Sequence, residues 1–143
     1  MYQIDVMSRT PVYEQIIQQT EEFILKGILS SGNRMPSVRT LSVELSVNPN
    51  TIQRAISELD RMNLIKSVPG KGSFISDNAL DILRLAKADE LEDIKTQLLS
   101  LKTAGITKED VMRCVNEVYK DDGINDNITK GSVFGDDAPG NKI

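Results

Sequence analysis

The feature that most constrains the fold is a very short connection, Ser46-Val47, between two stretches with helical spacing of apolar residues. The stretch before it, SVRTLSVEL at 37–45, repeats its apolar residues every three or four positions. The stretch after it opens with Asn48-Pro49. Asparagine is a common helix cap, and proline is common at the first helical position. Two helices joined by so short a turn are expected to cross at a steep angle, so the chain predicts a helix-turn-helix.

The first turn of the second helix is predicted to face a partner rather than the core. Ser37 is expected to cap the first helix and Asn48 the second, each side chain accepting a hydrogen bond from an orphan amide. The second helix is predicted to continue to about Met62. Its inward residues step by three and four positions: Ile52, Ala55, Ile56 and Leu59. Its outward residues near the N-terminus are all polar: Asn50, Thr51, Gln53 and Arg54.

A helical pattern precedes this pair and a hairpin pattern follows it. Thr10 is predicted to cap the preceding helix and Pro11 to take its first position, and Gly27 is expected to end it. Its inward residues are Val12, Ile16, Ile17, Phe23, Ile24 and Ile28. After Asn63, the segments LIKSV and SFIS flank PGKG, which predicts two strands and a turn with Lys71 at its tip. Residues 1–76 are therefore predicted to form a winged helix-turn-helix.

Residues 34–74, RMPSVRTLSVELSVNPNTIQRAISELDRMNLIKSVPGKGSF, resemble the DNA-binding domain of the GntR (gluconate-repressor) family of bacterial transcription regulators. That family shows P-S-x-R-x-L-A, a turn, a recognition helix, L-x-x-x-G-L-I and a G-x-G-x-F wing. The positions that resemble this pattern are Pro36, Ser37, Arg39, Leu41, Thr51, Ala55, Leu59, Leu64, Ile65, Gly70, Gly72 and Phe74. The helix predicted to begin at Pro11 is also similar to the first helix of the family, so the resemblance covers roughly residues 8–76. It implies a sequence-specific DNA-binding regulator.

Four positions depart from the family pattern. Ser42 stands where alanine is usual, Ser46 where glycine is usual, and Asn63 where glycine ends the recognition helix. Asparagine tolerates a positive φ, so Asn63 is a mild change. Many members carry a base-reading arginine where this chain has Pro49. The Asn-Pro-Asn-Thr version resembles the YtrA-type subfamily, which has a short helical tail in place of a large effector domain. That resemblance implies a repressor of its own operon.

The charge distribution favours DNA as the partner, although the net charge of the chain is −4. Residues 31–76 hold six Lys and Arg against three Asp and Glu, and these basic residues lie where the helix-turn-helix is predicted. A solvated surface without function remains the alternative reading of each charge. The predicted DNA-binding set is Arg34, Ser37, Arg39, Asn50, Thr51, Gln53, Arg54, Gly70, Lys71 and Gly72.

The members of this set are predicted to have different roles. Arg39 is expected at a phosphate, while Gln53 and Arg54 face outward toward base edges. The short polar side chains of Asn50 and Thr51 can hydrogen-bond to either a phosphate or a base edge. Lys71 between two glycines suits the minor groove. Two alternatives stay open: Arg34 can anchor its loop instead, and the glycines can serve turn geometry alone.

The second half of the chain predicts a helical dimerisation segment at 77–121. A long helix at about 79–103, capped by Asp77-Asn78, is stopped by Gly105, and a shorter helix follows, opened by Thr107 with Asp110. Two amphipathic helices cannot enclose a core alone, so their apolar faces are expected to meet a second copy. The predicted dimer interface is Leu91, Ile94, Leu98, Leu101, Val111, Val115, Val118 and Tyr119. Residues 122–143 are Gly-, Asn- and Asp-rich without period, which is typical of a flexible tail.

The composition excludes several functions. The chain has no histidine and one cysteine, so usual zinc sites, histidine-based catalysis and a disulfide framework are excluded, and neither an enzyme activity nor a cofactor is expected. Cys114 is expected to be a packed thiol. No apolar run suits a membrane and no secretory signal opens the chain, which predicts a cytoplasmic protein.

The expected architecture is mainly α with a small β-hairpin: a winged helix-turn-helix domain plus a two-helix dimerisation segment. The expected partners are a palindromic double-stranded DNA operator and a second copy of the chain, while a small effector stays an open question. Two other readings remain: a winged-helix module for protein contacts, and an architectural DNA binder without operator specificity. A gel-shift comparison of upstream intergenic DNA with random DNA separates all three.

Overall fold

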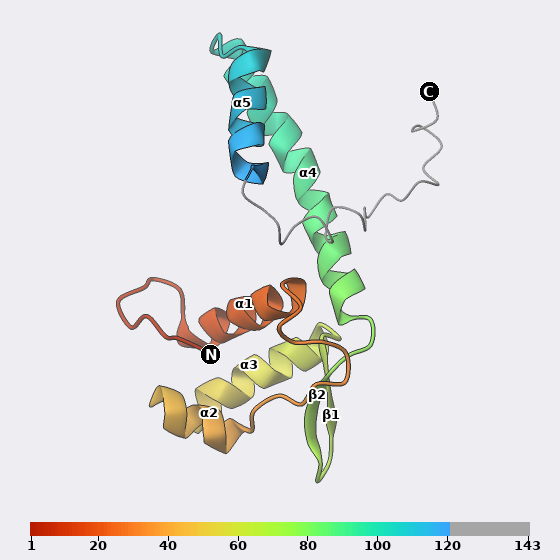
Figure 1. Cartoon of the computed structure of the whole chain (residues 1–143). Coiled ribbons are helices and arrows are strands. Elements are labelled where there is room, and N and C mark those ends of the chain that lie inside the picture. The colour runs from red at the N-terminus through yellow and green to blue at the C-terminus, as the bar shows by residue number, and fades with distance from the viewer. Residues whose placement is uncertain (121–143) are drawn as a thin grey trace. The chain divides into compact units, whose positions relative to one another are not determined.

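The computed structural model describes residues 1–120, which fall into two compact units: Met1–Arg84, and the residues from Leu85 onward. The described elements are mainly helices with one antiparallel hairpin (Figure 1), as the sequence predicts. They are α1 Val12–Leu25, α2 Val38–Leu45, α3 Pro49–Arg61, β1 Ile65–Val68, β2 Gly72–Ile75, α4 Ala79–Thr103 and α5 Lys108–Tyr119. The tail predicted at 122–143 lies outside the described residues.

Helix α1 begins one residue later than the sequence suggests and ends before Gly27, as expected. Pro11 is its N-cap, and no side chain caps the helix, so the predicted cap Thr10 is wrong. The first helical hydrogen bond runs from the Gln15 backbone N–H to the Pro11 carbonyl at 3.0 Å, which starts the helix one residue late, while the Gln15 side chain donates to the Thr10 carbonyl at 2.8 Å. At the other end Gly27 takes a φ of 75°, which leaves Ile28 outside the helix and more than half exposed.

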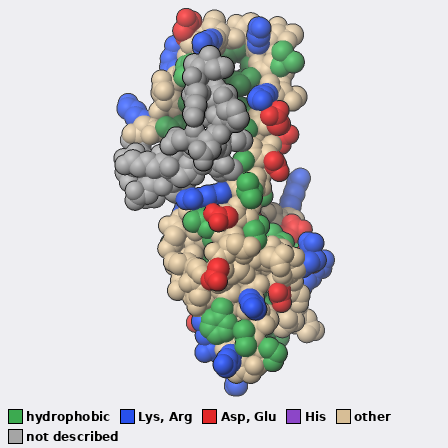
Figure 2. All heavy atoms as spheres, turned by 90° about the vertical axis from the view of Figure 1, so that its right-hand side faces the viewer, with side chains coloured by type: hydrophobic (Ala, Val, Ile, Leu, Met, Phe, Trp, Pro, Cys, Tyr) green, Lys and Arg blue, Asp and Glu red, His purple; other side chains and the backbone are tan. Residues whose placement is uncertain are grey.

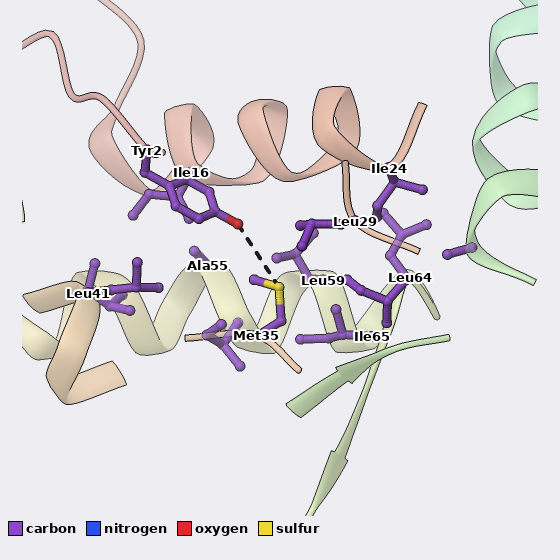
Figure 3. Close-up of a cluster of buried hydrophobic side chains, with 14 of the residues drawn as sticks. Tyr2, Ile16, Ile24, Leu29, Met35, Leu41, Ala55, Leu59, Leu64 and Ile65 are labelled. Carbon is purple, nitrogen blue, oxygen red and sulfur yellow. Dashed lines mark hydrogen bonds between the residues drawn. The ribbon is translucent and has the colours of Figure 1, made fainter. Parts of the chain in front are cut away.

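The core of the first unit lies between α1 and the helix-turn-helix, and it is closed by the sheet and by the start of α4 (Figure 3). Ile16, Leu41, Ile52, Leu59 and Leu64 are fully buried or nearly so. Each such side chain contributes about 1.5–3 kcal/mol by leaving water. Further buried apolar residues are Tyr2, Ile24, Leu29, Met35, Ala55, Ile56, Ile65, Ile75, Ala79 and Leu83.

A small network of three polar contacts lies inside this core. The Thr20 hydroxyl donates to the Ile16 carbonyl at 2.7 Å, and it lies 2.9 Å from the Tyr2 hydroxyl. Tyr2 also donates to the Met35 sulfur at 4.0 Å (Figure 3). These partners satisfy the buried hydroxyls, which would otherwise destabilise the core. The second residue of the chain is thus fixed against α1.

Among residues 1–120, two non-glycine residues adopt a positive φ, and both end helices. Ser46 after α2 has φ 52°, and Asn63 after α3 has φ 61°. At the end of α3, the Leu64 N–H donates to the Leu59 carbonyl and the Asn63 N–H donates to the Asp60 carbonyl, both at 3.0 Å. This pair of hydrogen bonds is a Schellman motif. Asparagine therefore replaces glycine at this position, as its tolerance of positive φ predicts.

The wing is an antiparallel pair in which Ile65 lies opposite Ile75 and Val68 opposite Gly72. A third segment joins it on the free edge of β2. Met35 N–H donates to the Ser73 carbonyl at 2.8 Å, and Ile75 N–H donates to the Asn33 carbonyl at 2.8 Å. The loop that leads into α2 is therefore fixed to the wing by backbone hydrogen bonds.

The second unit contains the rest of α4 and α5, and its apolar side chains are not enclosed. Thr107 and Asp110 form the predicted capping box, and a turn at 104–107 reverses the chain (Figure 1). No residue among 85–120 is buried, and only Ala88 and Val111 are half-buried. Cys114 is exposed, so the expectation of a packed thiol is wrong in the single chain. Within residues 1–120, no helix combines the length and the hydropathy that crossing a bilayer requires.

Candidate nucleic-acid interface

The start of α3 is built as the sequence predicts. The Asn48 side chain accepts a hydrogen bond from the Asn50 amide at 2.8 Å, and Pro49 takes the first helical position. The apolar stripe of α3 is buried against α1 and α2. On the opposite surface Asn50, Gln53 and Arg54 are exposed and Thr51 is half-buried. The first two turns of α3 therefore present polar side chains to solvent.

A groove of about 380 Å³ lies between the start of α2, the helix α3 and the wing. Five of the ten predicted DNA-binding residues line it: Arg34, Ser37, Gln53, Gly70 and Gly72. No carboxylate among the described residues lines the groove, so its charge comes from arginine alone. A groove with a guanidinium at its wall and no carboxylate in its lining suits a phosphate backbone.

Arg34 and Gly72 lie against each other at the wall of this groove. A side-chain carbon built at Gly72 would come within 2.9 Å of the Arg34 Nε, and Gly72 has a φ of 117°. The positive φ favours glycine at this position, whereas the close approach involves only the end of the exposed Arg34 side chain. Arg34 also pairs with Phe74 through the backbone, yet its side chain stays exposed. Arg34 thus anchors its loop and still presents its charge beside the wing.

The tip of the wing is a tight turn set by Pro69 and Gly70. Lys71 N–H donates to the Val68 carbonyl at 2.9 Å, and Gly70 has a φ of 76°, which together describe a type II turn. Lys71 follows this turn and is exposed. Figure 2 shows Lys and Arg side chains at the lower end of the molecule, where Figure 1 draws the turn between β1 and β2. The wing therefore ends in positive charge.

The start of α2 offers amide and hydroxyl groups to the same side. Ser37 caps α2 by accepting from the Thr40 amide at 3.0 Å, and its hydroxyl donates to the Thr40 hydroxyl at 2.8 Å. Arg39 projects from the first turn and is exposed. The N-terminus of a helix favours anions because its free amides and its dipole point outward. Ser37 and Arg39 are thus placed where a phosphate is favoured.

The remaining predicted residues do not line the groove. Arg39, Asn50, Thr51, Arg54 and Lys71 lie outside its lining.

The structure shows one contact of Arg54 that the sequence reasoning missed, and Tyr13 makes it. The Arg54 Cζ lies 3.8 Å from the centroid of the Tyr13 ring, so the recognition helix and α1 share a cation–π contact. The Tyr13 hydroxyl donates to Glu14 at 3.0 Å; this bond, more than burial, raises the pKa of Tyr13. An aromatic residue in the first turn of α1 was the available signal, but no spacing rule links it to Arg54.

The chain matches known regulators over most of its length. The family described as "Bacterial regulatory proteins, gntR family" matches residues 12–75. The HTH-type transcriptional repressor YtrA of Bacillus subtilis is 40% identical over 122 residues, which span 85% of this chain and 94% of that protein.

Solved structures agree with this match. A GntR family transcriptional regulator from Listeria monocytogenes is similar with a TM-score of 0.65 and 30% identity, over 80% of this chain and 98% of that one. YtrA from Sulfolobus acidocaldarius, a GntR-family transcription factor, is similar with a TM-score of 0.51 and 33% identity, over 64% of this chain and 97% of that one. With the helix-turn-helix, the wing and the groove between them, these similarities show that the chain belongs to the GntR family of bacterial regulatory proteins, within its YtrA-type branch.

Proposed function

We propose that this protein is a homodimeric DNA-binding regulator that recognises a palindromic operator and represses its own operon. The observation that carries the proposal is the acid-free groove between α2, α3 and the wing, beside the exposed polar turns of α3. In this proposal α3 enters the major groove, where each base pair presents a distinct pattern of donors and acceptors. Gln53 and Arg54 read base edges, while Asn50 and Thr51 contact a base or a phosphate.

The other members of the predicted set position the protein on the DNA backbone. Ser37 and Arg39 contact phosphates from the start of α2, and Arg34 does so from the groove wall. Lys71 reaches the minor groove, and Gly70 and Gly72 shape the wing that carries it. These contacts supply affinity that does not depend on sequence, whereas the contacts from α3 supply specificity.

The second unit supports the dimer. Each predicted interface residue is exposed in the single chain except Val111, which is half-buried. Figure 2 shows apolar side chains at the surface along the upper part of the molecule. A closed dimer with a two-fold axis would cover these side chains and present two copies of α3 to two half-sites. The half-sites are then one helical turn of DNA apart, about 34–36 Å, or a multiple of it.

The protein acts by binding and not by catalysis, as the relatives that it matches are named transcription regulators. It acts in the cytoplasm, where the bacterial chromosome lies. It needs no cofactor and no metal.

The test is the specificity ratio, the affinity for operator DNA divided by the affinity for a scrambled duplex of equal length. The operator duplex comes from the intergenic region upstream of its own gene. Gln53→Ala and Arg54→Ala should each lower this ratio by ~1–3 kcal/mol per lost base contact and leave the melting temperature nearly unchanged. Asn48→Ala is the matched control on the same helix, because it removes a cap and no proposed contact.

Three results distinguish the alternatives. A wild-type ratio near one indicates an architectural DNA binder. A failure to bind either duplex indicates a module for protein contacts. If neither Gln53→Ala nor Arg54→Ala changes the ratio, the outward surface of α3 does not read the operator.

The backbone contacts have their own test in the salt dependence of affinity. The logarithm of affinity should fall against the logarithm of salt concentration with a slope of about −0.9 per phosphate contact. Arg39→Ala and Lys71→Ala should each make the slope shallower and weaken binding to both duplexes alike. A flat plot for the wild-type protein contradicts the role of these residues at phosphates.

A further inference from the structure

The contact between Arg54 and Tyr13 joins the recognition helix to a helix with no proposed DNA contact. Arg54 projects from α3 and is exposed, whereas Tyr13 lies in the first turn of α1 and is half-buried. The Arg54 Cζ is 3.8 Å from the centroid of the Tyr13 ring. The guanidinium carbon thus lies over the face of the Tyr13 ring, where an arginine can stack by its flat side.

This arrangement restricts the arginine without using its hydrogen-bond donors. The five N–H groups of a guanidinium point outward in its own plane, so a ring against the flat side leaves them free. A bidentate contact to a guanine uses two of these donors. A free arginine side chain must give up rotamer freedom to make that contact, and a side chain that is already held gives up less.

The Tyr13 ring is itself held in place. Its hydroxyl donates to the Glu14 carboxylate at 3.0 Å, and its ring packs against the edge of the core of the first unit. A fixed ring under a mobile side chain is what a positioning contact requires. An isolated stack between two exposed, mobile side chains would not restrict Arg54 in this way.

We propose that Tyr13 is a positioning residue for operator recognition, which holds the Arg54 guanidinium in the orientation that reads a base edge. The proposal rests on the proposed role of Arg54. It adds a determinant of specificity on α1, outside the helix-turn-helix and the wing. The base that Arg54 reads should be guanine, because only guanine offers two acceptors to a guanidinium in the major groove.

The test compares variants that keep or remove the ring. Tyr13→Phe keeps the ring and loses the hydroxyl, while Tyr13→Leu keeps apolar volume and loses the π face. Affinity is measured at fixed salt for a duplex recovered by the wild-type protein from a randomised pool, and for a scrambled duplex. Tyr13→Leu should lower the specificity ratio about 2- to 5-fold, as expected for an exposed cation–π contact, while Tyr13→Phe retains most of it. Affinity for the scrambled duplex should stay nearly constant.

The double variant Tyr13→Leu/Arg54→Ala completes the design. It should show the same ratio as Arg54→Ala alone, because Tyr13 acts only through Arg54. If Tyr13→Leu does not fold at the assay temperature, Tyr13→Met serves as the second variant without a ring.

Failure of this inference is distinct from failure of the proposed function. If Arg54→Ala lowers the ratio and the variants without a ring do not, Tyr13 has no positioning role. The same conclusion follows if Tyr13→Phe loses as much as Tyr13→Leu, or if the two changes act additively. If Arg54→Ala leaves the ratio unchanged and lowers only the melting temperature, the contact is a structural link between α1 and α3, and both proposals fail for Arg54.

Discussion

The two units differ in where their apolar side chains lie. In Met1–Arg84 the apolar faces of α1, α2 and α3 meet, and the wing and the start of α4 close the core. In residues 85–120 the same kinds of side chain occur at the same helical spacing, but none is buried. Ile16 is fully buried in the first unit, whereas Ile94 is 46% exposed in the second.

The difference teaches that amphipathic spacing alone does not define a domain. Three helices and a hairpin surround a volume from several sides, so each apolar face finds another within one chain. One helix and a shorter one that follows it leave most of their apolar surface uncovered. The first unit should therefore be stable as a single chain, and the second should depend on a second copy. The following four predictions test this contrast.

The largest effect is expected from charges placed on the apolar stripe of α4. The double variant Ile94→Asp/Leu98→Asp should sediment as a monomer, because two carboxylates cannot be buried at the interface without partners. Affinity for operator DNA should fall at least ~100-fold, since two linked reading helices bind far more tightly than one. The control is Thr96→Asp/Thr103→Asp on the opposite side of α4, which should remain dimeric. A dimer in the first variant contradicts the interface.

The next effect separates a core position from an exposed one. Leu59→Ala should destabilise the first unit by about 2–5 kcal/mol, because Leu59 is fully buried. This loss should not depend on protein concentration. Val118→Ala, at a position 66% exposed in the single chain, should change stability only through dimerisation and therefore in a concentration-dependent way. Urea unfolding at two protein concentrations, about 50-fold apart, measures both. If the stability losses of the two variants depended on protein concentration in the same way, the proposed contrast between the units would be wrong.

A smaller effect compares helix caps in the two units. Asn48 caps α3 and Thr107 caps α5, each by accepting from a backbone amide. Asn48→Ala should lower the stability of the first unit by about 1 kcal/mol at any concentration. Thr107→Ala should leave the first unit unchanged and raise the dimer dissociation constant roughly 30-fold, because each of the two copies loses about 1 kcal/mol. Differential scanning calorimetry measures the stability of the first unit, and sedimentation equilibrium measures the dimer dissociation constant.

The smallest effect concerns pH and is confined to the first unit. Burial raises the pKa of Tyr2 above its ordinary value of 10.0, and the hydrogen bond with Thr20 partly opposes the rise. The folded state thus favours the neutral phenol. Its contribution to stability is complete below pH 10 and is lost as the pH rises through the raised pKa. Wild-type protein should lose more stability than Tyr2→Phe between pH 8 and pH 11. If urea unfolding showed the same loss of stability for the wild-type protein and Tyr2→Phe over this pH range, the role of the Tyr2 phenol would be contradicted.

Local sequence rules predicted the elements and their ends well. Ser37, Asn48 and Thr107 cap the helices that their positions indicate, and Asn63 adopts the positive φ that its place after α3 requires. These features depend on a few neighbouring residues, which a sequence displays directly. Thr10 is not the cap because Pro11 takes the N-cap position, and a shift of one residue at a helix start is not encoded by spacing.

Contacts between distant residues were beyond the sequence. The fit of Arg34 over Gly72 and the stack of Arg54 on Tyr13 depend on how the elements pack. Sequence reasoning could say that Arg54 faces outward, but it could not say which side chain lies beneath it. The exposure of Cys114 has the same origin, because valine neighbours on a helix indicate burial only if another element covers them.

The left-handed conformation of Ser46 has a consequence for how this protein can change. A serine with φ 52° is strained, and Ser46→Gly should relieve on the order of 0.5–1 kcal/mol, after allowance for the greater freedom of glycine in the unfolded chain. Ser46 lies outside the groove lining and before the recognition helix. A change at Ser46 can therefore act as a general suppressor of destabilising substitutions on α3. New operator preferences that cost some stability remain accessible to selection through this single position.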